Sequence, residues 1–269
     1  MAMRSIAVCI GDNCIDNYLP PIDRKFIGGN ALNVAVHLQQ GGIPTAYVGF
    51  VGDDMEGKII LDGLKSKGID VSHVQVLTGR TAQSYIRLSS EGDREFVHED
   101  LGEKESFSID ELTLRFILRH RLVHNTWLGG SESYLPQLKE TSDLVVSFDY
   151  GERCPPEFIE ETISYVDIAF FSLPEFRAEE ASKLAHHMRT RGPRLVVVTM
   201  GKKGSLAYDG EHEYLQHAFP VQVVDTLGAG DAYIGTFLAS WLKGESIPEG
   251  MERAAKVAAH TCTHLGAWE

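Results

Sequence analysis

One stretch of the chain reads Val223-Val224-Asp225-Thr226-Leu227-Gly228-Ala229-Gly230-Asp231-Ala232-Tyr233, and apolar residues at helical spacing follow it as far as Gly244. This order predicts a strand-like piece, a turn of small residues and then a buried helix. The N–H groups in the first turn of a helix lack partners and carry partial positive charge. Because Gly228, Ala229 and Gly230 add little side-chain bulk at this point, the stretch predicts a helix N-terminus that can bind an anion.

Two carboxylates flank this turn of small residues. Asp231 falls in the first turn of the predicted helix, close to whatever the N–H groups bind, and Asp225 precedes the turn. An aspartate beside a phosphate-binding turn is well placed to accept a proton from an attacking hydroxyl. An acidic residue in a first helical turn also stabilises the helix by itself, and this structural interpretation of Asp231 stays open.

Short apolar runs alternate with helical patterns along the rest of the chain. The apolar runs, which predict strands covered on both faces, are Ile6–Ile10, Ala46–Val51, Leu122–Thr126, Leu144–Phe148, Val166–Phe171 and Leu195–Thr199. The segments with helical periodicity are Asn30–Gln40, Met55–Lys67, Ile109–Leu118, Pro156–Tyr165 and Pro174–Arg191. Because strands and helices alternate, the sequence predicts an α/β fold with a doubly wound, mostly parallel sheet and helices on both of its faces.

One region, from Val71 to about Val97, lacks the helical pattern. The β-type pieces in this region are Val74–Leu77, Ala82–Leu88 and Glu95–His98. They predict a small antiparallel hairpin unit that projects from the main sheet. Such a unit is either a lid over a site at the strand ends or a surface hairpin without a role, and the pattern does not decide between the two.

Composition excludes several classes of protein. The 269 residues are 43% hydrophobic, and 25 Lys and Arg stand against 38 Asp and Glu, a net charge of −13. A surface this acidic repels phosphate backbones and anionic lipid, so we expect neither nucleic acid nor a membrane as partner. The sequence shows no signal-peptide pattern, no apolar run near the about 20 residues that span a bilayer, and no metal-ligand spacing among its cysteines. We therefore expect a cytoplasmic protein with free thiols.

Two further polar stretches adjoin predicted elements. Gly28-Gly29-Asn30-Ala31-Leu32-Asn33-Val34-Ala35 opens a helix, and its two glycines allow a ligand to approach the backbone closely. Gly11-Asp12-Asn13-Cys14-Ile15-Asp16 follows the first predicted strand, where open α/β sheets place ligands, and carboxylates there could bind sugar hydroxyls. Asn33 could equally be an exposed or backbone-bonded side chain, and residues 11–16 a plain polar loop.

Residues 200–205, Met-Gly-Lys-Lys-Gly-Ser, follow a predicted strand but do not form a Walker A loop. They lack the GxxxxGK[ST] spacing, and β-type residues follow them in place of a helix. The first strand–helix turn carries no GxGxxG, and neither HExxH nor GxSxG occurs in the sequence. The sequence thus argues against a Walker-type NTPase and against a dinucleotide-binding fold.

With Gly28–Ala35 and Asp225–Asp231 in this order, the chain resembles the ribokinase-like, or PfkB, carbohydrate kinases. Both signatures of that family are present, Gly-Gly-x-x-x-Asn-x-Ala and Asp-Thr-x-Gly-Ala-Gly-Asp, and the similarity extends from Ile6 to Trp268. The resemblance implies a single ribokinase-like kinase domain over residues 1–269, with a lid formed by about residues 12–27 and 71–100. It also implies an enzyme that uses ATP and Mg²⁺ to phosphorylate a hydroxyl of a sugar.

The resemblance assigns roles to residues at matching positions. Asp231 would be the base that deprotonates the acceptor hydroxyl. The N–H groups of Gly228, Ala229 and Gly230 would stabilise the charge that develops on the transferring phosphoryl group. The positions that match the family's contacts with the sugar are Asp16, Gly28, Gly29 and Asn33.

The resemblance also implies a nucleotide side and a metal side. In the family an Asn-x-x-Glu element holds Mg²⁺ and phosphates largely through water, and the corresponding segment here is Ser172-Leu173-Pro174-Glu175, with Ser in place of Asn. The positions that match the family's nucleotide contacts are Ser172, Thr199, Gly201, Gly204, Gly228 and Gly230. Asp225 and the backbone of Leu227 match the place where some members bind a monovalent cation such as K⁺.

Within the family, the chain is similar to members that phosphorylate fructosamines such as fructoselysine at the 6-hydroxyl of the sugar. The shared pieces are residues 10–14, 28–31, 33–36, 81–83 and the ending Gly266-Ala267-Trp268. A fructosamine needs a partner for its amine, for which Asp12 is the candidate. It also needs a partner for its amino-acid end, for which the lid residues Arg87 and Arg94 are candidates. The plain alternative for both arginines is a solvated surface or edge-strand position.

Other functions stay open at this point. One is a fructokinase or another PfkB sugar kinase, and another is a sugar-binding or sensor protein that has the fold without the activity. Because lid-mediated dimers are common in the family, the resemblance also allows a homodimer through the lid, where an exposed hairpin edge would suit pairing.

Overall fold

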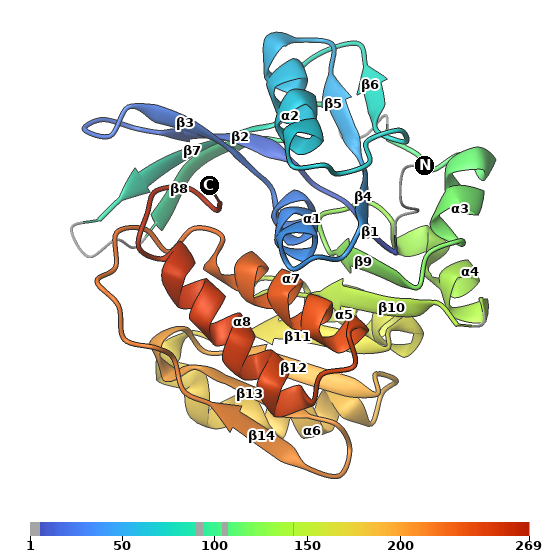
Figure 1. Ribbon diagram of the computed structural model, residues 1–269, viewed down its shortest axis with the longest axis vertical. Helices are drawn as coiled ribbons and strands as arrows, with labels where there is room; N and C mark the ends of the chain where they lie inside the picture. Colours follow the sequence, from blue (N-terminus) through green and yellow to red (C-terminus); the bar gives the residue numbers. More distant parts are fainter. Residues whose placement is uncertain (1–5, 90–93, 104–106, 142, 269) are drawn as a thin grey trace.

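The computed structural model describes residues 6–89, 94–103, 107–141 and 143–268, and its centre is an eight-stranded sheet (Figure 1). The strand order is β14-β13-β12-β11-β10-β9-β1-β4, and the strands pair in parallel except at β12–β13 and β13–β14, so β13 alone runs against the others. The bounds are β1 (Ala7–Ile10), β4 (Thr45–Val48), β9 (Leu122–Thr126), β10 (Val145–Asp149), β11 (Ile168–Ser172), β12 (Leu195–Thr199), β13 (Ser205–Tyr208) and β14 (Glu213–Gln216).

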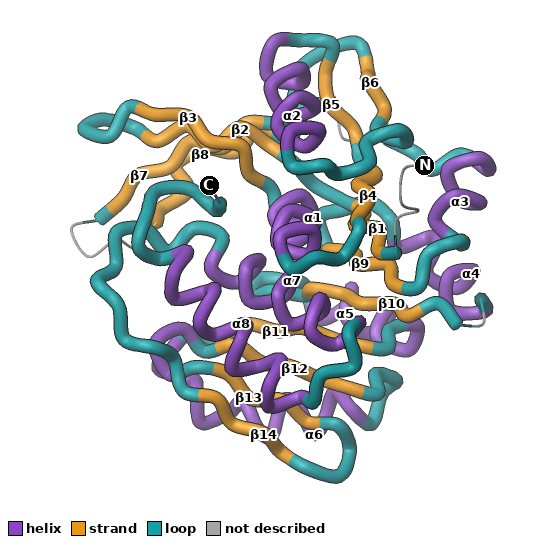
Figure 2. Tube along the Cα trace, viewed as in Figure 1, coloured by secondary structure: helices purple, strands orange, loops and turns teal. Residues whose placement is uncertain are grey.

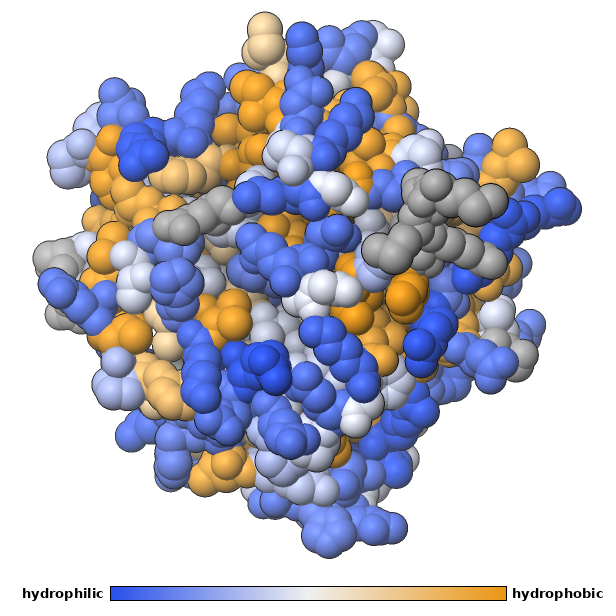
Figure 3. All heavy atoms as spheres, in the orientation of Figure 1, coloured by the Kyte–Doolittle hydropathy of each residue, from blue (hydrophilic) through white to orange (hydrophobic). Residues whose placement is uncertain are grey.

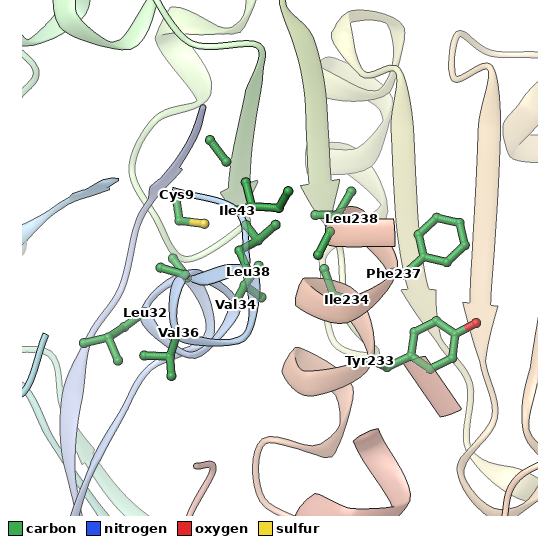
Figure 4. Close-up of a cluster of buried hydrophobic side chains, with 14 of the residues drawn as sticks. Cys9, Leu32, Val34, Val36, Leu38, Ile43, Tyr233, Ile234, Phe237 and Leu238 are labelled. Atoms are coloured by element: carbon green, nitrogen blue, oxygen red, sulfur yellow. The ribbon is translucent and has the colours of Figure 1, made fainter. Parts of the chain in front are cut away.

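The strands are apolar throughout because helices cover both faces of the sheet. In β1, Ala7 and Cys9 belong to one buried cluster, whereas Val8 and Ile10 belong to the other, as alternation along a strand requires. One face is covered by α1 (Asn30–Gln40), α7 (Ala229–Leu242) and α8 (Ile247–Thr261). The other is covered by α3 (Glu111–Ile117), α4 (Leu135–Glu140), α5 (Pro156–Thr162) and α6 (Ala181–Arg189). Figure 4 shows the first cluster, in which side chains of α1 and α7 meet the sheet.

A second, four-stranded sheet stands beside the large one, at the upper left of Figures 1 and 2. Its order is β3-β2-β7-β8, and its strands are β2 (Cys14–Tyr18), β3 (Arg24–Gly28), β7 (Gln83–Leu88) and β8 (Arg94–Asp100). We call these strands the small sheet. The expected antiparallel hairpin is present as β7 and β8. The β-type piece expected at Val74–Leu77 also forms a strand, but this strand is not part of the hairpin unit. Strand β6 (Gln75–Leu77) pairs in parallel with β5 (Phe50–Gly52), next to α2 (Met55–Ser66).

The expected α/β architecture is confirmed, with differences in single elements. The run Ala46–Val51 divides into β4 and β5 at Gly49, where a side chain would press against the hydroxyl of Tyr47 and the backbone of Gly11. The helix expected over Pro174–Arg191 begins as the 3₁₀ segment η4 (Glu175–Glu180) before α6. Helices α4 and α8 and the edge strand β14 were not predicted, whereas β13 lies where β-type residues were expected to follow residues 200–205.

The outer surface is mainly polar on the face seen in Figure 3, and apolar groups gather there over α2 and the small sheet. Exposed apolar side chains on α2 are Met55 and Ile59. No helix in the described part of the chain combines the length and the apolar character that crossing a bilayer requires. All of the cysteines are free thiols, as expected.

Candidate active site

Polar residues gather where the parallel strands of the large sheet end. Parallel strands place their carboxyl ends at one edge of the sheet, and open α/β sheets bind ligands there. The polar residues at these ends are Asp12 just after β1, Thr126 in β9, Asp149 in β10, Ser172 in β11 and Thr199 in β12. The N-termini of α1 and α7 reach the same edge, because hydrogen bonds link their first turns to Asp12, Asp149 and Asn33.

Asp231 lies half-buried in the first turn of α7, as the sequence predicts. The side-chain amide of Asn33 in α1 donates a hydrogen bond to Asp231 Oδ2 over 2.8 Å. Burial raises the pKa of Asp231 to about 8, helped by the negative charges of Asp149 and Asp12 and opposed by the Asn33 hydrogen bond and by Arg94. A carboxyl group with a pKa in this range can exchange a proton with a substrate near neutral pH.

The turn before α7 presents backbone to the site. Gly228 caps the helix in the left-handed region with φ of 75°, and it is buried. Gly230 is exposed, and a Cβ built on it would meet nothing within 4 Å, so a ligand has free access to the helix N-terminus at this point. The N–H of Ala229 donates to the carbonyl of Thr226 over 3.3 Å. The three amides expected to face an anion are therefore not equivalent, because that of Ala229 already has a partner.

Asp16 and the two glycines at 28 and 29 form one packing unit. Asp16 is 3% exposed, and a Cβ on Gly28 would overlap its carboxylate, so only glycine leaves room for that side chain. Gly29, with φ of 109°, passes directly over the backbone of Asn13. Burial raises the pKa of Asp16 to about 7, while a hydrogen bond from the Cys14 thiol, 3.3 Å away, opposes the shift. The glycines thus serve the close approach of β3 to the loop after β1.

The carboxylate of Asp12 links the loop after β1 to α1 and to β9. Its oxygens accept the backbone N–H of Asn30 at the start of α1 over 2.7 Å and the hydroxyl of Thr126 over 2.8 Å. The Asn30 side chain in turn donates to Asp149 Oδ2 over 2.6 Å. Asp12 is therefore a side-chain cap for α1, whatever else it binds.

Asp149 is a site residue that sequence reasoning missed. It is 5% exposed, and burial raises its pKa to about 6, opposed by hydrogen bonds from Asn30 and from the N–H of Gly151. The available signal was its position, since it is the first charged residue after the apolar run Leu144–Phe148, at the edge where ligands bind.

A pocket opens between the loop after β1 and the small sheet. Its polar walls come from Asp12 and Asn13 on one side and from Ser84, Glu99 and Asp100 on the other. Glu99 pairs with Ser84 in the register of β7 and β8, so the two share the face of the small sheet that lines the pocket. Asn13 is 5% exposed, and its Oδ1 is buried without a partner among the described residues. Among the described residues that line it, the pocket thus has acceptor groups and no cationic side chain.

The two arginines expected to meet the amino-acid end of the substrate do not line this pocket. Arg87 is exposed and pairs with Glu95 over 3.0 Å, and its place in β7 puts it on the face opposite to that of Ser84. Arg94 donates to the carbonyl of Thr226 over 2.9 Å, so it reaches the turn before α7 and does not line the pocket. Arg94 therefore lies beside the turn before α7, whereas Arg87 lies on the face of the small sheet opposite to Ser84.

The expected nucleotide residues lie at the ends of β11 and β12. The hydroxyls of Ser172 and Thr199 are 2.8 Å apart, and Glu175 accepts the backbone N–H of Lys202 over 3.1 Å, beside Gly201. Gly204 has φ of 96° and abuts the backbone of β14, which gives it a structural reason to be glycine. The described residues contain no group of three or more His, Cys, Asp or Glu side chains able to enclose a metal. Mg²⁺ fits such a site, since it usually binds through one or two carboxylates, substrate phosphates and water.

Asp225, the candidate ligand for a monovalent cation, is fully buried and faces three donors. Its oxygens accept the N–H of Leu227 over 2.9 Å, the N–H of Gly266 over 3.0 Å and the hydroxyl of Tyr18. Three hydrogen-bond donors around one carboxylate compensate its charge, and a cation at these oxygens would face their hydrogens. The carboxylate of Asp225 is thus hydrogen-bonded within the protein, and a monovalent cation at Asp225 and the backbone of Leu227 stays a prediction.

The chain is similar to carbohydrate kinases over nearly its whole length. The family described as pfkB family carbohydrate kinase matches residues 17–114 and 137–269. A fructoselysine 6-kinase of Shigella flexneri is 36% identical over 267 residues, covering 99% of this chain and 100% of the relative. A fructosamine kinase of Bacillus subtilis (strain 168) is 31% identical over 264 residues, covering 97% and 92%. The structure of Arabidopsis thaliana ribokinase with ribose and ATP superposes with a TM-score of 0.84 at 23% identity, covering 98% of this chain and 95% of the other.

Proposed function

The chain belongs to the PfkB family of carbohydrate kinases and is thus a phosphotransferase, and on this basis we propose that it transfers the γ-phosphoryl group of ATP to the 6-hydroxyl of a fructosamine such as fructoselysine. The observation that carries the proposal is Asp231, a half-buried carboxylate held by Asn33 at the open N-terminus of α7. The kinship to fructosamine kinases at 36% and 31% identity supports the class of acceptor.

In the proposed reaction Asp231 accepts the proton of the acceptor hydroxyl. The hydroxyl oxygen forms a bond to the γ-phosphorus as the bond from that phosphorus to the departing ADP oxygen breaks. Negative charge develops on the transferring group, and the N-terminus of α7 at Gly228 and Gly230 would stabilise this charge through its backbone N–H groups. Arg94, which already contacts the turn at Thr226, adds a positive charge on the same side.

The sugar is assigned to the buried face of the site. Asp16, beside Gly28, would accept hydrogen bonds from sugar hydroxyls, and Asn33 would orient the sugar next to Asp231. The small sheet would act as a lid that excludes water and limits hydrolysis of ATP. Mg²⁺, held by Glu175 through water and by the nucleotide phosphates, would supply positive charge that offsets the charge of those phosphates.

The pocket beside the small sheet supports a cationic substituent on the sugar. Asp12 and Glu99 bring negative charge to it. A fructosamine carries a protonated secondary amine next to the ketose, and such an ammonium group donates to carboxylates and carbonyl oxygens. A plain ketose has no cationic group that would offset this charge.

The proposal is tested by ADP release with fructoselysine, fructose-asparagine and fructose as acceptors. We expect turnover with the fructosamines, and we expect Asp231→Asn to lower kcat by about 10²–10⁴ while ATP still binds. Strong preference for fructose would indicate a fructokinase. Sugar binding without ADP formation from any acceptor would indicate a catalytically silent sugar-binding protein. Turnover of Asp231→Asn near that of the wild type would contradict the role of the base.

A second prediction concerns the amine. Glu99→Gln removes one negative charge from the pocket, so KM for fructoselysine should rise roughly 3- to 10-fold, with KM for fructose unchanged. Glu95→Gln is the matched control, since Glu95 lies on the same strand but pairs with Arg87 on the opposite face. If Glu99→Gln raises KM for fructoselysine and for fructose equally, the pocket does not recognise the amine.

A further inference from the structure

The C-terminal residues Gly266–Trp268 lie beside α1 and the turn before α7, with the chain end near the small sheet in Figure 1. The N–H of Gly266 bonds to Asp225, and His37 Nε2 donates to the carbonyl of Ala267 over 3.1 Å. His37 is neutral at physiological pH, because burial lowers its pKa to about 4. These bonds fix the backbone that carries Trp268.

Trp268 completes a chain of hydrogen bonds that ends at the candidate base. Its indole Nε1–H donates to Asn33 Oδ1 over 3.0 Å, and Asn33 Nδ2 donates to Asp231 Oδ2 over 2.8 Å. Asn33 is 3% exposed, so water does not readily replace either partner. The three side chains come from the C-terminal segment, α1 and α7, which lie far apart in the sequence.

The indole decides which way the Asn33 amide faces. An amide can rotate by half a turn and exchange its oxygen and its NH₂ group, but an indole N–H can only donate. The amide oxygen must therefore face Trp268, and the NH₂ group must face Asp231. In the reversed orientation the amide oxygen would repel the Asp231 carboxylate, or accept a hydrogen bond from its protonated form.

We propose that Trp268 is a positioning residue for the phosphoryl transfer: through Asn33 it keeps an N–H donor directed at Asp231 and so keeps this carboxylate ready to accept a proton. A donor facing the carboxylate favours its charged form. The groups that act on Asp231 from the neighbouring elements are Asp149 and Asp12, which oppose ionisation, and Arg94, which favours it together with Asn33. The proposal rests on the proposed function of Asp231 as the base.

The test is the pH profile of kcat/KM for Trp268→Phe. The variant keeps an aromatic ring but lacks the N–H that orients the Asn33 amide. The midpoint of the acidic limb should therefore shift to higher pH by about 0.5 to 1 unit. At pH 7, kcat/KM should then fall roughly 3- to 10-fold, and the rates should approach those of the wild type above pH 9. Trp241→Phe is the matched control, since Trp241 lies near the far end of α7, over Arg194, and should leave the profile unchanged.

Two results would overturn the inference. One is an equal loss of kcat/KM at every pH, which a merely structural role would produce. The other is a shift of the acidic limb by Trp268→Phe that is just as large in the Asn33→Ala background. In that background the indole of Trp268 has no amide to orient, so the substitution should leave the pH profile unchanged. No ADP formation by the wild-type protein with any sugar would instead contradict the proposed function, so the two failures are distinguishable.

A measurement without substrate covers the case in which Trp268→Phe does not fold. The sequence has 3 tryptophans, so Trp127→Phe with Trp241→Phe leaves Trp268 as the sole tryptophan, whose emission is excited selectively at wavelengths that tyrosine does not absorb. Its emission should titrate with the midpoint of the acidic limb, and Asp231→Asn should abolish that titration. Emission that is flat across this range, or that titrates unchanged in Asp231→Asn, would contradict the coupling.

Discussion

Asp231 receives opposing influences from its neighbours at the scale of single residues. Burial and the charges of Asp149 and Asp12 favour its neutral form, whereas Asn33 and Arg94 favour the carboxylate. The balance raises its pKa to about 8. At pH 7 the larger part of the substrate-free protein thus carries a protonated Asp231, which cannot accept a proton.

The activity should consequently increase with pH in the neutral range. We expect kcat/KM to rise through an apparent pKa near 8 and to level off above it, because the ionised base becomes the main form. Steady-state assays between pH 6 and 10, with the coupling enzymes checked at each pH, measure this. A profile that is flat across this range would contradict the assignment of the base.

At the scale of elements, the two glycines at the start of α7 have different tasks. Gly228 adopts φ of 75°, and a Cβ there would overlap Ala267 of the C-terminal segment, so it serves the packing of that segment. Gly230 has no neighbour in reach of a Cβ, so the packing of the fold does not require glycine there. One glycine is required by the fold and the other by the proposed chemistry.

Alanine substitutions should separate these two tasks. Gly230→Ala should lower kcat roughly 10- to 100-fold with stability kept or slightly raised, since the methyl group projects into the space for the phosphoryl group. Gly228→Ala should lower the free energy of unfolding by about 1–3 kcal/mol, because it strains the backbone and crowds Ala267. Urea unfolding and ADP release measure both. Full activity in folded Gly230→Ala would show that no ligand group needs that space.

At the scale of the whole molecule, three carboxyl groups are held where burial favours the neutral form. The raised pKa values are about 7 for Asp16, about 6 for Asp149 and about 8 for Asp231. A raised pKa in the folded state means that the fold binds more protons than the unfolded chain between the two pKa values. The site therefore costs the fold stability as the pH rises from about 4 to about 8.

Removing one of these acids should stabilise the protein at alkaline pH. Asp231→Asn should raise Tm above that of the wild type at pH 8, and the two values should converge toward pH 4. Asp209→Asn is a control for which the expected change in Tm at pH 8 has the opposite sign. Burial alone would raise the pKa of Asp209, but hydrogen bonds from the N–H groups of His212 and Glu211 lower it. Its loss should lower Tm at pH 8. A lower Tm for Asp231→Asn at pH 8 would contradict the raised pKa.

The dimer expected through the lid stays a prediction. In the small sheet β3 and β8 are the outer strands, and their outer edges are the ones a second copy could pair with. Sedimentation or light scattering measures the oligomeric state directly.

Local patterns determined much of this protein. The apolar runs predicted the parallel strands, because both faces of such strands are buried and alternation is lost. The small-residue turn at Gly228 to Asp231 and the glycines at 28 and 29 revealed the two helix N-termini, because these conformations and close approaches depend on residues adjacent in sequence.

Only the tertiary structure decided which distant residues complete the site. Asp149 meets Asn30, and Glu99 faces Asn13 across the pocket, although more than 80 positions separate each pair in the sequence. Trp268 reaches Asn33, and Arg87 turns away from the pocket because of the register of β7 and β8. Contacts of this kind follow from chain topology and strand register, and no local pattern in a single sequence carries that information.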